Sequence, residues 1–249
     1  MSRSPRRPSS SRGPRDRRRT GAYITIVAAL AIVAFVVLVI DHGLTGALRV
    51  LVGQDPEGGR GTPGPGTSAD AEQAQRLLAE IPVEEPRPRG DYERDEFGSS
   101  WVDTDDNGCS TRHDILARDL DRVQVAGDCK VTEGVLDDPY TGERLEFTSE
   151  DPQAVQIDHV VPLSLAWRMG ASEWDRDTRI EFANDPDNLL ASDGPANMSK
   201  GDAGPGEWQP YEGFQCEYAV AYVEVTHRYE LAVSAEDREG LDRMLGTCA

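Results

Sequence analysis

The chain has 249 residues and a formal net charge of −19, from 45 acidic and 26 basic residues. Residues 1–20 hold eight Arg and one Asp, a net charge of +7, which leaves −26 (−19 less +7) for residues 21–249. This acidity excludes a protein that coats nucleic acid through basic side chains, because that binding mode needs many Lys and Arg on the phosphates. It does not exclude an enzyme in which a bound cation supplies the positive charge.

The first 40 residues divide into a basic tail and an apolar run. Residues 1–20 have too little apolar surface to fold alone, so we expect a disordered cytoplasmic tail. Residues 21–40 are expected to form a transmembrane anchor helix. The 19 residues from 22 to 40 carry no charge, and a transmembrane helix needs roughly 20 apolar residues. A cleaved signal peptide is the alternative, but its apolar region usually has about 7–15 residues. The positive-inside rule then places everything after the anchor outside the cytoplasm.

Residues 41–90 are expected to form an extracytoplasmic linker. Nine of the fourteen residues 53–66 are Gly or Pro, a composition typical of a flexible tether. Residues 71–81 have helical spacing and predict a short helix inside the linker, which three prolines between residues 82 and 89 then end. We expect the compact domain to cover residues 91–249.

That domain has enough residues for one core, and its pattern predicts an α+β fold. The acidic stretch from Asp103 to Asn107 lacks the full EF-hand pattern, so a solvated turn is favoured over a calcium loop. Residues 155–161 predict a strand that Pro162 stops. Helices are expected over residues 112–121, 163–169, 215–229 and 235–245.

Four cysteines give a second indication of the compartment. Cys109, Cys129, Cys216 and Cys248 form no CxxC pair, so a structural zinc site is poorly supported. Two disulfides fit an oxidising exterior, and the simplest pairing joins Cys109 to Cys129 and Cys216 to Cys248. Four cysteines permit three connectivities, so the pairing is open at this point.

Five polar residues form the constellation that carries chemistry. Asp158 and His159 end the predicted strand, Asn188 follows 29 residues after the histidine, Asn197 nine residues later, and Lys200 three after that. Hydrolysis of a phosphodiester through water needs a base of near-neutral pKa, and an unperturbed His is near 6.5. The Asp158 carboxylate and the Asn197 amide are oxygen donors of the kind that hard divalent ions prefer.

These residues stand in the motifs DHVVPL, FANDPDNLL and NMSKGDAGPGEW. Through them the sequence resembles the HNH nucleases, also called ββα-metal or His-Me finger nucleases, and among them the family related to the C-terminal domain of GmrSD restriction enzymes. The resemblance extends over residues 91–249, including the paired cysteines. It implies a ββα-metal core inside a mostly helical, disulfide-linked domain, here preceded by one transmembrane helix.

The resemblance also implies roles for single residues. His159 becomes the general base and Asp158 a metal ligand, while Asn197 takes the place of the last ligand. Asn188 matches the asparagine that orients the base, and Lys200 the basic residue expected near the scissile phosphate. The implied ion is Mg²⁺, with Mn²⁺ as the alternative. The 29 residues between His159 and Asn188 exceed the simplest pattern, and we interpret residues 163–183 as an inserted helical segment.

Three further residues are candidate substrate contacts: Arg168, Arg179 and Trp208. Solvent exposure is the alternative for each arginine, and core packing is the alternative for the tryptophan. Asn197 also begins a formal N-glycosylation sequon, but the arginine-rich usage favours a bacterial source and with it the metal-ligand role.

The sequence therefore predicts a metal-dependent endonuclease acting on DNA, or on RNA, outside the cytoplasmic membrane and anchored through residues 22–40. No protein partner is predicted. A secreted form released by cleavage is the alternative location. The alternative function is a catalytically inactive, anchored envelope-binding module with the same fold, for which the acidic surface is the supporting feature.

Overall fold

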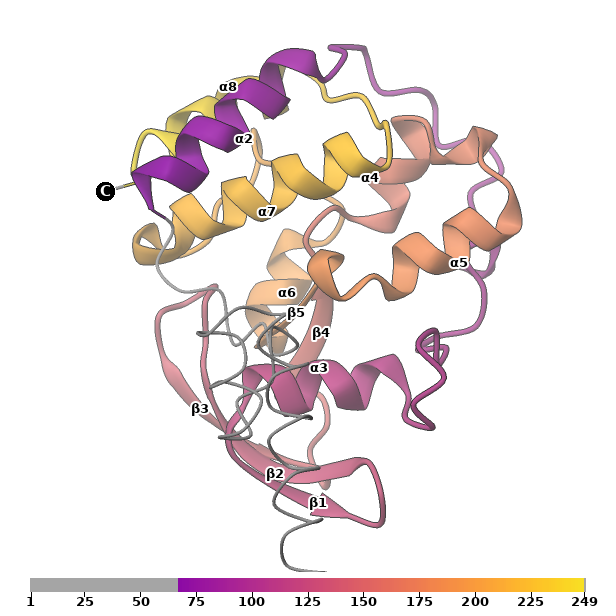
Figure 1. Ribbon diagram of the computed structural model, residues 1–249, viewed down its shortest axis with the longest axis vertical. Helices are drawn as coiled ribbons and strands as arrows, with labels where there is room; N and C mark the ends of the chain where they lie inside the picture. Colours follow the sequence, from indigo (N-terminus) through magenta and orange to yellow (C-terminus); the bar gives the residue numbers. More distant parts are fainter. Residues whose placement is uncertain (1–66, 249) are drawn as a thin grey trace, which may run out of the picture. The chain divides into compact units, whose positions relative to one another are not determined.

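A computed structural model describes residues 67–248 of the chain (Figure 1). The described residues belong to one compact unit. The predicted basic tail, the apolar run and most of the linker lie outside the described residues. Within residues 67–248, no helix is long and apolar enough to cross a membrane.

The described elements alternate between helices and short strands. In chain order they are α2 Ser68–Glu80, η1 Arg94–Phe97, α3 Thr111–Asp119, β1 Asp121–Ala126, β2 Lys130–Asp137, β3 Arg144–Thr148, β4 Val155–His159, α4 Leu163–Arg168, η2 Ala171–Glu173, α5 Arg176–Asn184, η3 Pro186–Asn188, β5 Leu189–Asp193, α6 Gly194–Lys200, η4 Glu212–Phe214, α7 Gln215–Arg228 and α8 Ala235–Leu245. The predicted α+β class is confirmed, and so is each helix predicted within these residues.

Helices α2, α7 and α8 pack together on one side of the domain (Figure 1). Thr67 and Asp70 form a capping box that starts α2, and Ala74 and Leu78 are buried against the neighbouring helices. A parallel bridge between Val83 and Val233 continues this contact. The compact unit therefore includes α2, which begins well before the boundary that we expected at residue 91.

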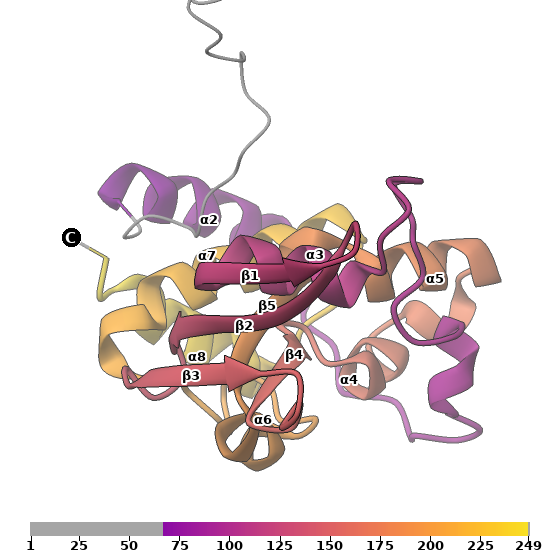
Figure 2. The ribbon, with the colours of Figure 1, turned by 90° about the horizontal axis from the view of Figure 1, so that it is seen from below.

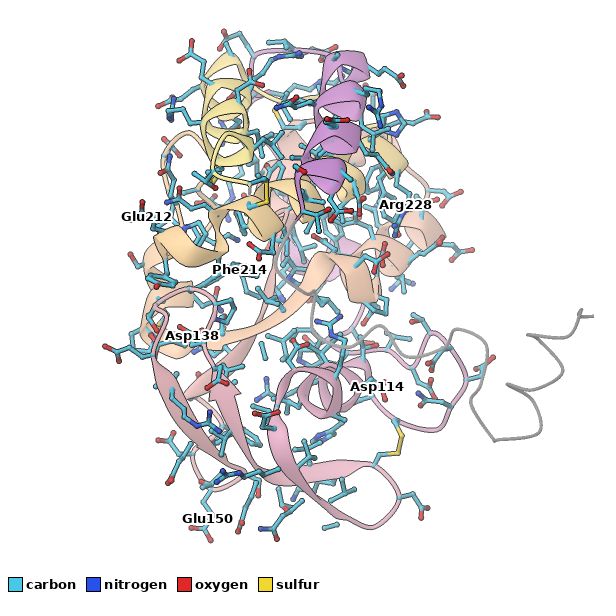
Figure 3. The ribbon with its side chains drawn as sticks, turned by 60° about the vertical axis from the view of Figure 1, so that its left-hand side comes forward. Asp114, Asp138, Glu150, Glu212, Phe214 and Arg228 are labelled. Carbon is cyan, nitrogen blue, oxygen red and sulfur yellow. A yellow bond between two sulfur atoms is a disulfide. The ribbon has the colours of Figure 1, made fainter. Side chains whose placement is uncertain are left out.

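A three-stranded antiparallel sheet in the order β1-β2-β3 covers the opposite side (Figure 2). The turn between β2 and β3 brings Asp138 close to the start of α7, near Glu212 and Phe214 (Figure 3). There the main-chain N–H of Tyr211 donates to the carbonyl of Tyr140 over 2.9 Å. The hairpin is thus fastened to the helical side, and its Tyr140 side chain is buried.

Between these two sides, strands β4 and β5 form a two-stranded antiparallel sheet that leads directly into α6 (Figure 1). Asp158 pairs with Leu190 and His159 with Leu189 in its register. The strand ends at His159, as the expected break before Pro162 requires. Helices α4 and α5 occupy the chain between the two strands, so the predicted inserted segment is helical.

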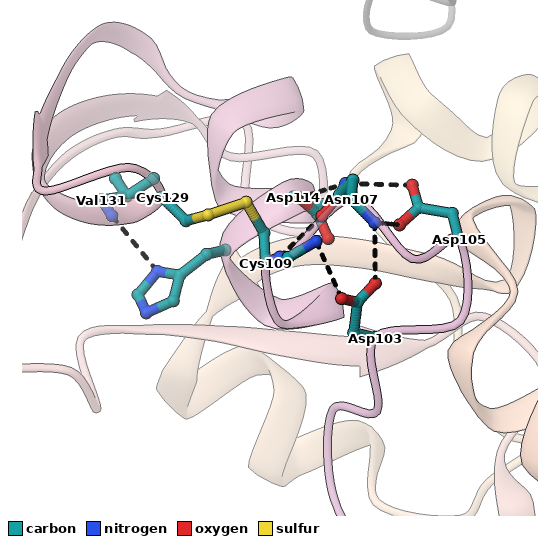
Figure 4. The surroundings of a disulfide bond; sticks show 9 residues. Asp103, Asp105, Asn107, Cys109, Asp114, Cys129 and Val131 are labelled. Carbon is teal, nitrogen blue, oxygen red and sulfur yellow. Dashed lines mark hydrogen bonds between the residues drawn. A yellow bond between two sulfur atoms is a disulfide. The ribbon is translucent and has the colours of Figure 1, made fainter.

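Two disulfides join Cys109 to Cys129 and Cys216 to Cys248, which confirms the simplest pairing. Figure 4 shows the first bond beside the acidic turn, where Asn107 is hydrogen-bonded to Asp103 and Asp105. The turn is organised by these internal hydrogen bonds. Within the described residues, no group of three or more His, Cys, Asp or Glu side chains is arranged to hold a metal ion.

Candidate active site

A pocket of about 660 Å³ opens where β4, α6 and the segment before α3 meet. Its lining includes the predicted residues Asp158, His159 and Asn197. Three arginines share the lining, Arg89, Arg94 and Arg112, together with Trp101 and Asp202. The domain has a large excess of acidic residues, yet three arginines lie together in this pocket.

His159 lies at the end of β4, with its ring buried at 6% exposure. Its Nε2 is 2.9 Å from the carbonyl oxygen of Ala183. A carbonyl only accepts hydrogen bonds, so Nε2 carries the proton and Nδ1 keeps a free lone pair. The indole of Trp101 stacks on the ring, with centroids 6.1 Å apart. The local hydrogen bond thus selects the tautomer that a general base needs.

The imidazole of His159 is neutral at physiological pH. Burial lowers its pKa from 6.5 to about 4 and outweighs the opposing effects of the Ala183 carbonyl and the Asp158 charge. The charges of Arg94 and Lys200 act in the same direction as burial. An unprotonated nitrogen is therefore available beside the pocket.

Asn188 holds this arrangement from behind and does not line the pocket. It is fully buried; its Oδ1 accepts from the N–H of Val161 at 2.8 Å, and its Nδ2 donates to the carbonyl of Phe182 at 3.3 Å. Phe182 precedes Ala183, the residue whose carbonyl holds the His159 ring. Asn188 therefore ties the end of β4 to the end of α5, beside the residues that hold the His159 ring.

The carboxylate of Asp158 is held by two buried donors. The hydroxyl of Tyr140 donates to Oδ2 over 2.6 Å, and the ammonium of Lys200 lies 2.7 Å from the same atom. Burial raises the pKa of Tyr140 well above its usual value, and the Asp158 charge adds to this, so the hydroxyl stays protonated. Both partners fix the orientation of a carboxylate that also reaches the pocket.

Lys200 lies inside the domain. Its side chain is 0% exposed, and its ammonium donates to the carbonyl of His159 at 2.8 Å as well as to Asp158. The resemblance placed this residue near the scissile phosphate. The structure places it behind the pocket wall, because the buried carboxylate of Asp158 requires a cation there.

Asn197 extends from α6 into the pocket. Its Nδ2 donates to Oε1 of Gln156 over 2.9 Å. This hydrogen bond uses the amide nitrogen, so the amide oxygen Oδ1 is available to a cation. The Asp158 carboxylate and this amide oxygen are hard ligands on one pocket wall. Such a set fits Mg²⁺, which takes one or two protein ligands and keeps several waters.

The structure does not bring the three predicted substrate contacts to the pocket. Arg168 donates to the carbonyl of Arg87 at 3.0 Å, and Arg179 is held by Glu96 at 3.3 Å. Trp208 packs edge-on against the ring of Tyr140, with centroids 4.7 Å apart. Each side chain makes an internal contact instead, and its contact with substrate stays a prediction.

Sequence reasoning missed the residues that do line the pocket from the segment before α3. Arg89, Tyr92, Arg94 and Trp101 come from a stretch without helical or strand periodicity. A weak signal was present, since aromatic and basic residues alternate closely in this stretch. Arg112, in the first turn of α3, also lines the pocket.

Fold and site define a disulfide-linked α+β domain in which a buried histidine lines a pocket and a buried asparagine lies behind the pocket. The family of the C-terminal domain of GmrSD restriction endonucleases matches residues 111–242, and the chain belongs to this family. An uncharacterized secreted protein of Arthroderma benhamiae is 39% identical over 189 residues, which covers 75% of this chain and 90% of that protein. No solved structure matched the chain.

Proposed function

We propose that this chain is a metal-dependent endonuclease that hydrolyses phosphodiester bonds of DNA. The observation that carries the proposal is His159, a neutral base with a free Nδ1 lone pair beside a pocket lined by arginines. A general base needs this protonation state to take a proton from the attacking water. Membership of a restriction-endonuclease family supports the same reaction class.

The unit β4–β5–α6 serves as the ββα-metal core in this proposal. Two antiparallel strands lead into one helix, and they carry Asp158, His159 and Asn197 to one pocket. Asp158 and Asn197 would hold Mg²⁺, or Mn²⁺ as the alternative. The ion would supply a positive charge that stabilises the negative charge developing on the phosphate and the leaving oxygen. His159 accepts the proton of water, and Asn188 keeps its ring in place.

The reaction takes place outside the cytoplasm in this proposal. Two disulfides are typical of an oxidising compartment, and a secreted relative supports the same location. Residues 22–40 would anchor the chain in the cytoplasmic membrane, with the secreted form as the alternative. Fractionation of cells that express the full chain separates the two, because an anchored chain stays with the membrane after a high-salt wash.

The test of the reaction is cleavage of supercoiled plasmid by the full chain, purified in mild detergent, with Mg²⁺ or Mn²⁺. We expect nicking that His159→Ala lowers by at least about 10²-fold, the low end for loss of a general base. His227→Ala is the matched control, because His227 lies on α7, pairs with Glu80 and does not line the pocket. A parallel arm with RNA defines the substrate.

Equal nicking by His159→Ala and the parent chain would contradict the assignment of the base. Intact plasmid and RNA with every metal would contradict the nuclease and favour the non-catalytic binding module. Loss of nicking in His227→Ala as well would attribute the effect to folding, so the thermal midpoint of each variant is measured alongside.

A further inference from the structure

A nuclease site needs a cation that binds the phosphate being cleaved. The resemblance assigns this task to Lys200, but its ammonium is bound to Asp158 and to the carbonyl of His159, and its side chain is 0% exposed. Nucleic acid cannot reach Lys200 in this arrangement. Another side chain must meet the phosphate if the proposed function holds.

Three arginines line the pocket, and their existing contacts distinguish them. The guanidinium of Arg112 is already hydrogen-bonded, because it donates to the carbonyls of Pro152 and Val155, each at 3.2 Å. Arg89 lies over the ring of Tyr92, 5.0 Å from its centroid. Within residues 67–248, the guanidinium of Arg94 makes no hydrogen bond and no ion pair. Within the same residues the guanidinium of Arg89 likewise makes no hydrogen bond or ion pair, so Arg94 is set apart by its place beside His159 in the main pocket and in a small adjoining hollow.

Arg94 also has the right neighbours. It lines the main pocket with His159 and Asp158, and it lines a small adjoining hollow with His159 and Trp101. The buried base is therefore flanked by Arg94 in both cavities. A phosphate between the guanidinium and the proposed ligands Asp158 and Asn197 would lie beside the nitrogen that activates water.

The backbone that carries Arg94 is anchored. Arg94 begins η1, whose last residue Phe97 is buried at 2% exposure. The following Gly98 has φ +83°, and a Cβ there would lie 2.7 Å from the side chain of Ile180. The ion pair of Arg179 with Glu96 ties the same turn to α5. The position of Arg94 is thus fixed although its side chain is exposed.

We propose that Arg94, and not Lys200, binds the scissile phosphate of the nucleic-acid substrate. The proposal rests on the function proposed above. A guanidinium suits this role because its planar fork donates two parallel hydrogen bonds to phosphate oxygens, whereas an ammonium acts as a point charge. Arg89 and Arg112 would add to the local field that attracts the strand.

The test compares Arg94→Ala and Arg94→Lys with Arg176→Ala, an exposed arginine at the start of α5 that does not line the pocket. Cleavage is measured on the full chain. Binding of a fluorescent DNA duplex is measured in the His159→Ala background, where no cleavage interferes. We expect Arg94→Ala to lower kcat/KM by about 10²-fold, Arg94→Lys to lower it less, and Arg176→Ala to leave it unchanged.

Two further readouts separate phosphate binding from a structural role. The slope of log binding constant against log salt concentration should fall by about one in Arg94→Ala, because one phosphate contact is lost. The affinity for Mn²⁺ in the absence of DNA and the thermal midpoint should both stay as in the parent. Lost Mn²⁺ affinity or an unchanged salt slope would overturn the assignment.

The outcomes also separate this inference from the function on which it rests. A parent chain that binds the duplex but never cuts it contradicts the nuclease, while the salt slope still decides the role of Arg94. Equal cleavage and equal binding by Arg94→Ala and the parent contradict the role of Arg94 and leave the nuclease intact. A parent chain that neither binds nor cuts overturns both.

Discussion

Asp158 lies at the centre of the polar contacts of the site. Its carboxylate joins the hydroxyl of Tyr140 from the β2–β3 turn, the ammonium of Lys200 from α6 and the pocket itself. The Asp158 side chain is 9% exposed, so little water surrounds the carboxylate and the Lys200 ammonium is its neighbouring cation. Removal of one partner of a buried pair leaves an uncompensated charge, which costs far more than the loss of an exposed pair.

We therefore expect Lys200→Met to lower the free energy of unfolding by about 3–5 kcal/mol. Methionine keeps the length of the side chain but leaves the Asp158 carboxylate buried without its cation. The measurement is urea unfolding of the full chain, with Lys130→Met as the control. Lys130 is exposed and is the only other lysine of the chain. Equal midpoints for both variants would contradict a buried ion pair.

The sequence indicated which residues meet at the site but not which way each one faces. The resemblance brought Asp158, His159 and Asn197 to one site, and all three line one pocket. The inward direction of Lys200 was not predictable, since it depends on Asp158 being buried and on Tyr140 arriving from a separate hairpin. Arg168 donates to a backbone carbonyl, and Arg179 donates to two besides its ion pair with Glu96; no residue pattern reveals such carbonyl partners.

At the scale of elements, the site depends on how closely α6 approaches β4. Asp193 caps the helix by accepting from the N–H of Ala196, and Pro195 occupies its first turn. Gly194 lies between them with its N–H bonded to the carbonyl of Ala154 at 3.0 Å. A Cβ on Gly194 would lie 2.1 Å from the carbonyl oxygen of Gln153. Only glycine permits this distance between helix and strand.

Gly194→Ala should therefore destabilise the domain, although alanine favours helices. Main-chain atoms on both sides must move apart, and overpacking of this kind costs about 1–3 kcal/mol. The shift would also move Asn197, one turn further along α6, and so weaken Mn²⁺ binding. Thermal unfolding and Mn²⁺ titration check both effects. An unchanged Mn²⁺ affinity in Gly194→Ala would contradict the link between this helix start and the metal site.

Helices were more predictable than strands in this chain. Periodic apolar residues predicted α2, α7 and α8, because each buries one face on its neighbours. The sheet β1-β2-β3 was not predicted. Strand β1 is exposed along nearly its whole length, so it lacks the alternation by which a half-buried strand is recognised.

At the scale of the whole molecule, the disulfides close the described domain at its two sides. Cys109–Cys129 joins the chain before α3 to the turn between β1 and β2. Cys216–Cys248 joins the first turn of α7 to the chain after α8, across a sequence separation of 32. Each bond stabilises the fold mainly because it reduces the conformational entropy of the unfolded chain.

The double variant Cys216→Ser with Cys248→Ser should lose about 2–5 kcal/mol of stability, as is usual when a native disulfide is removed. Urea unfolding without reductant is the measurement, and reduction of the parent chain should give at least the same loss because both bonds then open. If the urea midpoint of the parent chain is the same with and without reductant, neither bond stabilises the fold.

The pocket is assembled from two separate stretches of the chain. The proposed base, metal ligands and their buried supports lie within residues 111–242, the part that matches the family. Arg89, Arg94 and Trp101 lie upstream of that match. Under the proposed function, substitutions in this upstream stretch change the contacts to the nucleic acid, while the proposed base and metal ligands stay in place. Relatives that share the matched region can thus differ in substrate preference, and a fragment limited to that region would keep the histidine but lose most of the pocket's positive charge.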